Sequence, residues 1–326
     1  MQQGVEAVVT AVCERVLEAT PAAVTAPATG NSKRTALVGL RDGREVVVQY
    51  RARERPLDAE VAVTRAVAGR TDLPAAPVLA AGTLTDPPVS YFVTRRVPGD
   101  DLHERFAGLP AADRERLART LGRHLAAVHE AFAFDAPGRV AARGDDLVVP
   151  GPRPAEAFYR EYLDRALADW PGSLRDLEPR VEAVLADRLG GLPADDIRLF
   201  PWDYRPGNVI VRDAEGGPEV AAVLDWGEPL AAPAGLSAAK AEFTLADWYV
   251  RVDADVRALR EAYRAGYREV RPFPEAGFGA FRLLGIADSA ADSRGEVTRP
   301  RYPVVDAEAA VAFHRDRIEA ALDRLD

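Results

Sequence analysis

The sequence predicts an α+β fold of two lobes, a small antiparallel sheet with one helix and a larger, mainly helical part. Strand-like segments are concentrated before residue 98 and helix-like segments follow it, with a single hairpin embedded among the later helices. We therefore expect an N-terminal lobe over residues 1–97 and a C-terminal lobe over residues 98–326. The chain has 326 residues, 48% of them hydrophobic, which suffices for two lobes around a cleft.

The N-terminal lobe is expected to open with an amphipathic helix over residues 3–19, because valines recur at helical spacing between Val5 and Val16. Prolines then end the helix. The segments ALVGL (residues 36–40) and EVVVQYR (residues 45–51) are rich in β-branched residues, and an Asp-Gly pair between them favours a tight turn. A helix followed by an antiparallel hairpin is therefore expected.

A short helix and a third strand complete the predicted sheet lobe. Residues 57–69 place alanines and valines on one helical face, and a glycine can end the segment. Residues 89–97, VSYFVTRRV, are β-branched and aromatic, and Pro98-Gly99 stops the run abruptly. The order strand, strand, helix, strand indicates a small sheet with one helix.

The C-terminal lobe is predicted to consist of helices around one hairpin. A hairpin is expected within residues 197–225, and residues 135–154 suggest an irregular connection. The Ala/Pro-rich stretch 228–242 suggests a loop leading into a helix. Helices are expected over residues 112–132, 154–169, 176–189, 254–270, 277–292 and 306–325.

Composition narrows the classes of function. The formal net charge is -9, and a non-specific nucleic-acid binder needs a basic face, so nucleic acid is not an expected partner. The single cysteine, Cys13, excludes an internal disulfide and favours a reducing compartment, of which the cytoplasm fits best. No apolar stretch approaches the length of a membrane span, so no membrane contact is expected. The oligomeric state stays open.

Arginine carries nearly all the positive charge. Only Lys33 and Lys240 are lysines among the 42 basic residues. A high genomic G+C content is one explanation, and adaptation to salt, given the many acidic side chains, is another. Lysine is therefore a rare residue in this chain.

One segment of the C-terminal lobe gathers oxygen donors. In LFPWDYRPGNVIV, Asp203 lies in a loop and Asn208 opens a strand, and in VAAVLDWGEP the returning strand ends at Asp225. A hairpin therefore brings Asn208 and Asp225 to the same end. Carboxylate and amide oxygens suit Mg²⁺, which takes few protein ligands beside phosphate oxygens and water. Asp203 is left to orient a substrate hydroxyl and accept its proton, as phosphoryl transfer requires.

With these residues the sequence resembles the aminoglycoside phosphotransferase and choline kinase family, whose pattern is HxDxxxxN followed by an aspartate before tryptophan. The resemblance covers roughly residues 30–250. It implies a protein-kinase-like fold, and binding of ATP or another nucleoside triphosphate together with Mg²⁺. It also implies a phosphotransferase acting on a hydroxyl of a small molecule of the antibiotic, amino-alcohol or sugar class. By this resemblance, Asp203 is the catalytic base, and Asn208 and Asp225 are the metal ligands.

The resemblance also implies a nucleotide site in the N-terminal lobe. Residues 28–35 are the expected phosphate-covering loop, Gln49 stands where the family carries a phosphate-binding lysine, and Glu60 matches the glutamate that pairs with that lysine. Backbone groups of residues 94–97 are expected to face the purine. The predicted nucleotide-binding residues are Ser32, Lys33, Gln49, Glu60, Arg95 and Val97.

Three features depart from the family pattern, one of them the loop at residues 28–35, which has a single glycine and is a poor phosphate cradle. Pro201 replaces the motif histidine and cannot make the hydrogen bonds of an imidazole. Gln49 is neutral, so Glu60 has no cation on its neighbouring strand. Lys33 or the adjacent Arg34 is one source of that cation, as the neighbouring strand is in some protein kinases, and the alternative is that Lys33 is a solvated loop lysine. A nucleotide-binding pseudokinase without transfer activity therefore stays an alternative. A protein kinase is disfavoured, because no DFG or APE-like segment follows the hairpin.

Further residues near the motif have two interpretations each. Trp202 and Trp248 suggest core packing, with stacking on a substrate as the alternative. Glu242 and Asp247 are either pocket-lining acids or surface and helix-capping acids, the usual case for such residues. The sequence does not identify the substrate.

Overall fold

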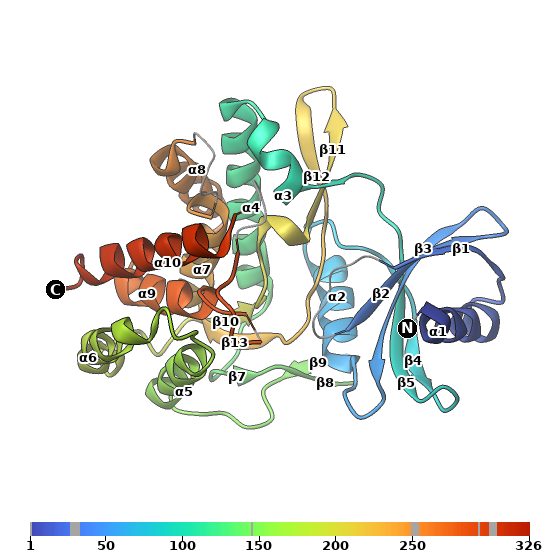
Figure 1. The fold of residues 1–326 in the computed structure, drawn as a ribbon, viewed down its shortest axis with the longest axis horizontal. Coiled ribbons are helices and arrows are strands. Elements are labelled where there is room, and N and C mark those ends of the chain that lie inside the picture. The colour runs from blue at the N-terminus through green and yellow to red at the C-terminus, as the bar shows by residue number, and fades with distance from the viewer. Residues whose placement is uncertain (1, 27–32, 145, 249–253, 293, 300–304) are drawn as a thin grey trace.

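The structure is a computed structural model, and it describes residues 2–26, 33–144, 146–248, 254–292, 294–299 and 305–326. It has the predicted fold class, with an antiparallel sheet at one end and a mainly helical part at the other (Figure 1). The sheet strands are β1 (Pro21–Thr25), β2 (Arg34–Leu40), β3 (Glu45–Ala52), β4 (Val78–Leu84) and β5 (Val89–Arg95). Their order in the sheet is β1-β2-β3-β5-β4. The division into lobes at residues 1–97 and 98–326 stays a prediction.

The two faces of this sheet bury different partners. Successive side chains of a strand point to opposite faces, so Val48 of β3 is buried against α1 (Gln2–Val16), while Gln49 faces the other way. On the second face, Phe92 of β5 packs with residues at the start of α2 (Asp58–Arg70). Figure 1 shows α1 and α2 on opposite sides of the sheet. The face that carries Gln49 therefore looks toward α2 and the helical part.

The sequence pattern misses two strands of this sheet, β1 and β4. Both are edge strands, and their sequences, PAAVT and VLAAGTL, contain proline, glycine and several alanines in place of a β-branched run. An edge strand pairs on one side only, so it tolerates residues that a central strand disfavours. The three strands that the sequence predicts are the three central strands.

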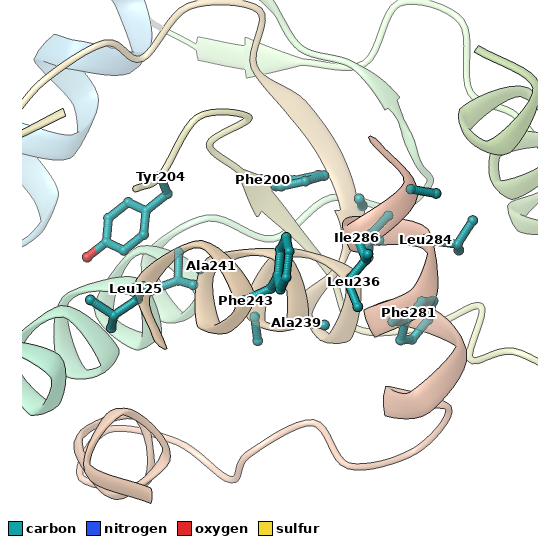
Figure 2. Packing of buried hydrophobic residues seen from close by; sticks show 14 of the residues in the cluster. Leu125, Phe200, Tyr204, Leu236, Ala239, Ala241, Phe243, Phe281, Leu284 and Ile286 are labelled. Atoms are coloured by element: carbon teal, nitrogen blue, oxygen red, sulfur yellow. The ribbon is translucent and has the colours of Figure 1, made fainter. Parts of the chain in front are cut away.

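The helical part is built around one fully buried helix. Its helices are α3 (Leu102–Arg105), α4 (Ala111–Ala131), α5 (Ala155–Ala168), α6 (Glu178–Leu189), α7 (Ala234–Ala246), α8 (Val256–Arg268), α9 (Phe278–Ser289) and α10 (Ala307–Leu322). Every residue of α7 is buried. Figure 2 shows α7 between α4 and α9, with Leu236 of α7 and Ile286 of α9 close together in the core.

The sequence interpretation of residues 228–242 as a loop leading into a helix is wrong for most of these residues. The stretch forms β13 (Leu230–Pro233) and then most of α7. A helix buried on all sides shows no amphipathic periodicity, so its Ala-rich sequence lacks the signal by which the outer helices are predicted.

Two small sheets hold the segment that contains the motif. The predicted hairpin is confirmed as β11 (Val209–Ala214) and β12 (Gly217–Val223), in which Val209 pairs with Val223. β10 (Ile197–Phe200) does not join this hairpin, because it pairs with β13 instead. β6 (Asp100–Asp101) pairs with β11 and links the end of the large sheet to the hairpin. Residues 201–208 therefore connect two sheets, which fix both ends of the loop.

The connection over residues 135–154 is more ordered than the sequence suggests. It contains β7 (Gly138–Arg139), which pairs with β13, and a hairpin of β8 (Ala141–Arg143) and β9 (Asp146–Val148). The hairpin lies against α2. Arg70 at the end of α2 also donates a hydrogen bond to the carbonyl oxygen of Ala131, with a distance of 2.6 Å. The helix that carries Glu60 is thus attached to the helical part. No helix in the described ranges is long and apolar enough to cross a membrane.

Three buried histidines of the helical part make the fold sensitive to acid. Burial lowers the pKa of His124 and His314 to about 4 and that of His129 to about 3. In the unfolded chain the pKa of histidine is about 6.5. The unfolded state therefore binds more protons below this value, and stability that is present above about pH 6.5 is lost as the pH falls toward the folded pKa values.

Lowering the pH from about 7.5 to about 5 is expected to reduce the free energy of unfolding by about 2 kcal/mol for each of these histidines. Urea unfolding at the two pH values measures the change. In a His124→Gln variant the change should be smaller by the contribution of one histidine. A free energy of unfolding that is the same at both pH values would contradict this account.

Candidate active site

The loop between β10 and β11 is anchored to the core by the residues around Asp203. The N–H of Tyr204 donates to the carbonyl oxygen of Pro201 at 3.3 Å, and the Tyr204 hydroxyl donates to the carbonyl oxygen of Leu121 in α4 at 2.9 Å. Thr244 of α7 donates to the carbonyl oxygen of Tyr204 at 3.4 Å. Figure 2 shows the Tyr204 ring extending toward α4. These contacts stabilise the loop even though Pro201 offers no imidazole.

Asp203 is held by two neighbours in the same loop. Arg205 Nε donates to Asp203 Oδ1 at 2.6 Å. The Asn208 amide nitrogen donates to Asp203 Oδ2 at 3.0 Å and to the Asp203 carbonyl oxygen at 2.8 Å. The amide nitrogen of Asn208 is therefore committed to Asp203, which leaves its amide oxygen as the atom available to a metal ion.

The environment of Asp203 favours its ionised form. Burial acts to raise the pKa of the carboxyl group, but the Arg205 guanidinium, the Lys240 ammonium and the Asn208 amide lower it, and the pKa lies below its ordinary value. The side chain is 34% exposed, so it remains accessible. An accessible carboxylate can accept a proton from a hydroxyl.

Lys33 joins the sheet to the metal-binding candidates. Its ammonium donates to Glu60 of α2 and, at 3.0 Å, to Asp225 Oδ1 after β12. The side chains of Lys33 and Glu60 are each 6% exposed, and that of Asp225 is 39% exposed. The adjacent Arg34 is exposed. Of the two cations proposed from the sequence, Lys33 is therefore the one that contacts the carboxylates.

Gln49 occupies a different position in the site. Its amide donates to Thr35 Oγ1 at 3.3 Å, across the β2–β3 register. Lys33 immediately precedes β2, two residues before Thr35. Burial acts to lower the pKa of Lys33, but the Asp225 and Glu60 carboxylates raise it above its ordinary value. A charged ammonium from Lys33 thus supplies the cation that Gln49 lacks.

The turn after Asp225 requires a small residue. A Cβ atom at Gly227 would lie 3.1 Å from Asp225 Oδ1 and 3.2 Å from Glu60 Oε2. Both distances are tighter than ordinary carbon contacts, so a side chain there would push one carboxylate away. Glycine at this position allows Glu60 and Asp225 to share Lys33.

The remaining predicted nucleotide contacts lie near the end of β5. The Arg95 N–H donates to the carbonyl oxygen of Pro77 at 2.9 Å, so it belongs to the sheet. Val97 follows, and within the described residues it makes no backbone hydrogen bond. Of the backbone groups predicted to face a purine, those of Val97 are therefore the ones least occupied by hydrogen bonds within the protein. Ser32 lies outside the described residues.

The side-chain oxygens of Asn208 and Asp225 suit a magnesium ion whose other ligands are phosphate and water. Among the residues that the structure describes, no group of three or more His, Cys, Asp or Glu side chains is placed to hold a metal. Mg²⁺ needs only one or two protein ligands beside phosphate and water. Asn208 and Asp225 lie at the same end of the β11–β12 hairpin, where the Leu224 N–H donates to the Asn208 carbonyl oxygen at 2.7 Å.

Two acids near the motif have a role that the sequence does not indicate. Glu242 is fully buried and accepts from Arg264 and Arg282, and Asp247 is buried and accepts from Arg260 and Arg282. Both are interior acids neutralised by arginines, so neither lies on the surface or lines a pocket, although Asp247 does occupy the C-cap position of α7. Charge pairing between distant segments has no local sequence signal.

Comparison with known proteins places the chain in a family. A model of the phosphotransferase enzyme family matches residues 23–274. The chain belongs to this family. The predicted family resemblance, the protein-kinase-like fold and the phosphotransferase class are thereby confirmed. None of the curated proteins matches the chain significantly in sequence.

Solved structures of similar fold have low sequence identity to this family member. A thermostable variant of aminoglycoside phosphotransferase APH(4)-Ia, in a ternary complex with AMP-PNP and hygromycin B, has a TM-score of 0.64 at 16% identity, covering 97% of each chain. An amicoumacin kinase in complex with AMP-PNP and Ca²⁺ has a TM-score of 0.64 at 14% identity, covering 99% of this chain and 96% of its own. A putative fructosamine-3-kinase from Thermobifida fusca has a TM-score of 0.59 at 21% identity, covering 95% and 98%. At these identities the likeness shows the fold alone.

Two residues at this site were not predicted from the sequence. Arg205 contacts Asp203 and lies within the motif itself, so its place between Asp203 and Asn208 could have indicated it. Lys240 acts on Asp203 electrostatically from α7, and its rarity as a lysine was the only sequence signal.

Proposed function

We propose that this phosphotransferase family member transfers the γ-phosphoryl group of ATP, or of another nucleoside triphosphate, to a hydroxyl group of a small molecule with the help of Mg²⁺. The observation that supports this proposal most strongly is that two groups of side chains meet at one site. Lys33, Glu60 and Asp225 form one group, and Asp203 with Asn208 forms the other. The hydrogen bond from the Leu224 N–H to the Asn208 carbonyl oxygen joins the two, and the Asp225 charge acts on Arg205 beside Asp203. The nucleotides and Ca²⁺ bound by similar structures support the choice of cofactors.

The residues divide the work of the reaction. Asp203 accepts the proton of the acceptor hydroxyl, whose oxygen bonds to the γ-phosphorus as the bond between that phosphorus and the β,γ-bridging oxygen breaks and the nucleoside diphosphate leaves. Arg205 and Lys33 supply positive charge beside the phosphates. Asn208 and Asp225 would hold Mg²⁺, which when bound neutralises phosphate charge. Val97 offers backbone groups to the purine.

Pro201 and Gln49 favour a second candidate, a nucleotide-binding pseudokinase. The two functions differ in one observable, since both bind a nucleotide but only one transfers phosphate. Titration with AMP-PNP and with GMP-PNP in the presence of Mg²⁺, run beside an assay of ADP or GDP release with amino-alcohols, sugars, nucleosides and antibiotics as acceptors, separates them. Acceptor-dependent ADP or GDP release supports the phosphotransferase. Nucleotide binding without transfer to any acceptor supports the pseudokinase, and no nucleotide binding contradicts both.

Lys33→Ala is expected to weaken ATP binding by about 10-fold or more, because a charge-assisted contact to phosphate is lost, while adenosine binding stays nearly unchanged. Adding Gln49→Lys should restore part of the ATP affinity, since it returns a cation to the face that Glu60 shares. Calorimetric titration with ATP and with adenosine measures both. Arg34→Ala, which removes the exposed neighbouring cation, is the matched control. Equal ATP affinity in the parent and in Lys33→Ala would remove Lys33 from the phosphate site.

A further inference from the structure

Both lysines of this arginine-rich chain are buried at the candidate active site. Lys33 is 9% exposed and contacts Glu60 and Asp225, and Lys240 is 8% exposed and lies against Trp202, the residue before Asp203. An ammonium is a compact point charge that fits where the planar guanidinium does not. The proposed phosphate contact accounts for Lys33, but the nucleotide site leaves Lys240 unexplained.

Lys240 belongs to a cluster of four side chains from separate elements. Its ammonium lies 4.2 Å from the centre of the Trp202 ring and donates to Asp288 of α9. The Arg165 guanidinium of α5 lies 4.1 Å from the same ring, and its Nη2 lies 3.9 Å from Asp288 Oδ1. We call Arg165, Trp202, Lys240 and Asp288 the Trp202 cluster.

The Trp202 cluster borders Asp203 on the side of the helical part. Its members come from α5, the motif loop, α7 and α9, whereas Lys33 comes from the residue before β2 and Glu60 from α2. Trp202 is adjacent to Asp203 in sequence, and the Lys240 charge contributes to the lowered pKa of Asp203. An acceptor approaching Asp203 from the side opposite the nucleotide would therefore meet this cluster.

The exposed part of the cluster is cationic. The Asp288 side chain is 5% exposed and already engages Lys240, whereas the Arg165 side chain is 40% exposed. Arg165 Nη2 itself is buried beside Asp288 and, within the described residues, makes no hydrogen bond, so the guanidinium is open to solvent only through its other atoms. The nearby acids of α7, Glu242 and Asp247, are paired with arginines. An acceptor with several amino groups would thus meet uncompensated positive charge, while an acidic acceptor would be attracted.

We propose that the Trp202 cluster is the acceptor subsite and that it takes a hydroxyl compound carrying a carboxylate or a phosphate group. The inference rests on the proposed phosphotransferase function and assigns its substrate class. Arg165 binds the acidic group through its guanidinium, which matches the geometry of both anions. The buried Lys240 adds positive charge beside Trp202, and its contact with Asp288 holds it in place.

Two acceptor series matched in size and differing in charge test the proposal. The three-carbon series is glycerate, glycerol 3-phosphate, glycerol and 3-amino-1,2-propanediol, and the six-carbon series is gluconate, glucose 6-phosphate, glucose and glucosamine. ADP release at saturating ATP and Mg²⁺ gives kcat/KM for each. An anionic member is expected to exceed its neutral and cationic counterparts by about 10-fold or more. Which anion is preferred distinguishes carboxylate from phosphate.

Substitutions in the Trp202 cluster test whether it causes the preference for anionic acceptors. Arg165→Glu should reverse the charge preference, mainly through KM, without loss of AMP-PNP affinity. Arg160→Gln, an exposed arginine of the same helix paired with Glu156, is the control and should keep the preference. Because Lys240→Met alone leaves Asp288 buried without its partner, it is combined with Asp288→Leu. This pair removes one positive and one negative charge, so the preference should persist through Arg165.

Three results would overturn the assignment of an acidic acceptor. They are faster reaction of the cationic members, an unchanged preference in Arg165→Glu, and no reaction of any anionic member although an acceptor of another class is phosphorylated. Failure of the parent to phosphorylate any acceptor of these series or of the wider panel of amino-alcohols, nucleosides and antibiotics would instead contradict the proposed function itself, so the two failures are distinguishable.

Discussion

Asp203→Asn is expected to lower acceptor phosphorylation by a factor on the order of 10³, because the amide keeps the shape of the carboxylate but cannot accept the hydroxyl proton. Nucleotide affinity should change little, since Asp203 contacts Arg205 and Asn208 and leaves Lys33 and Asp225 in place. Turnover is measured as acceptor-dependent ADP release, and binding by titration with AMP-PNP and Mg²⁺.

Asp213→Asn is the matched control for this change. Asp213 is a carboxylate of the same β11–β12 hairpin, it pairs with Arg105, and its side chain is 78% exposed. Its replacement should leave turnover unchanged. Unchanged turnover in Asp203→Asn would exclude Asp203 as the base, and an equal loss of nucleotide binding and turnover would make it a ligand or a structural residue instead.

Asp225→Ala is expected to abolish the Mg²⁺-dependent part of nucleotide binding with little loss of fold stability. The side chain is 39% exposed, and its contact with Lys33 is shared with Glu60. In the parent, AMP-PNP with Mg²⁺ at about 100 times Kd should stabilise the fold by about 2.7 kcal/mol, seen as a rise in Tm of several degrees. In the variant most of this rise should disappear.

Glu219→Gln on β12 is the control for the metal site, because Glu219 is exposed and pairs only with Arg212 among the described residues. Thermal unfolding of the parent and both variants is compared with and without Mg²⁺. If ATP and Mg²⁺ stabilise Asp225→Ala as much as the parent, Asp225 does not bind the metal.

The sequence predicts those parts of the fold whose signals are local. The central strands and the amphipathic helices carry regular periodicity, and the spacing from Asp203 to Asn208 followed by Asp225 is visible in the sequence alone. The edge strands β1 and β4 and the buried helix α7 carry no such periodicity, because their residues meet either too few neighbours or neighbours on every side.

The sequence suggests which residues of the site carry which chemical roles, but it does not show which side chains contact one another. Rarity and position in the sequence suggested Lys33 as a replacement cation, and the structure places it against Glu60 and Asp225. The pairing of Glu242 and Asp247 with arginines of α8 and α9 depends on how distant helices pack, which no local pattern encodes. The same holds for Lys240 beside Trp202.

Anomalous diffraction from Mn²⁺ in crystals grown with AMP-PNP tests the central claim most directly, since Mn²⁺ substitutes for Mg²⁺ at oxygen sites. The account predicts the nucleotide between the sheet and the helical part, with the triphosphate at Lys33. It also predicts an anomalous peak bound by the Asn208 amide oxygen and the Asp225 carboxylate, and Asp203 facing the terminal phosphate. A nucleotide bound elsewhere, or a metal peak that contacts neither Asn208 nor Asp225, would contradict it.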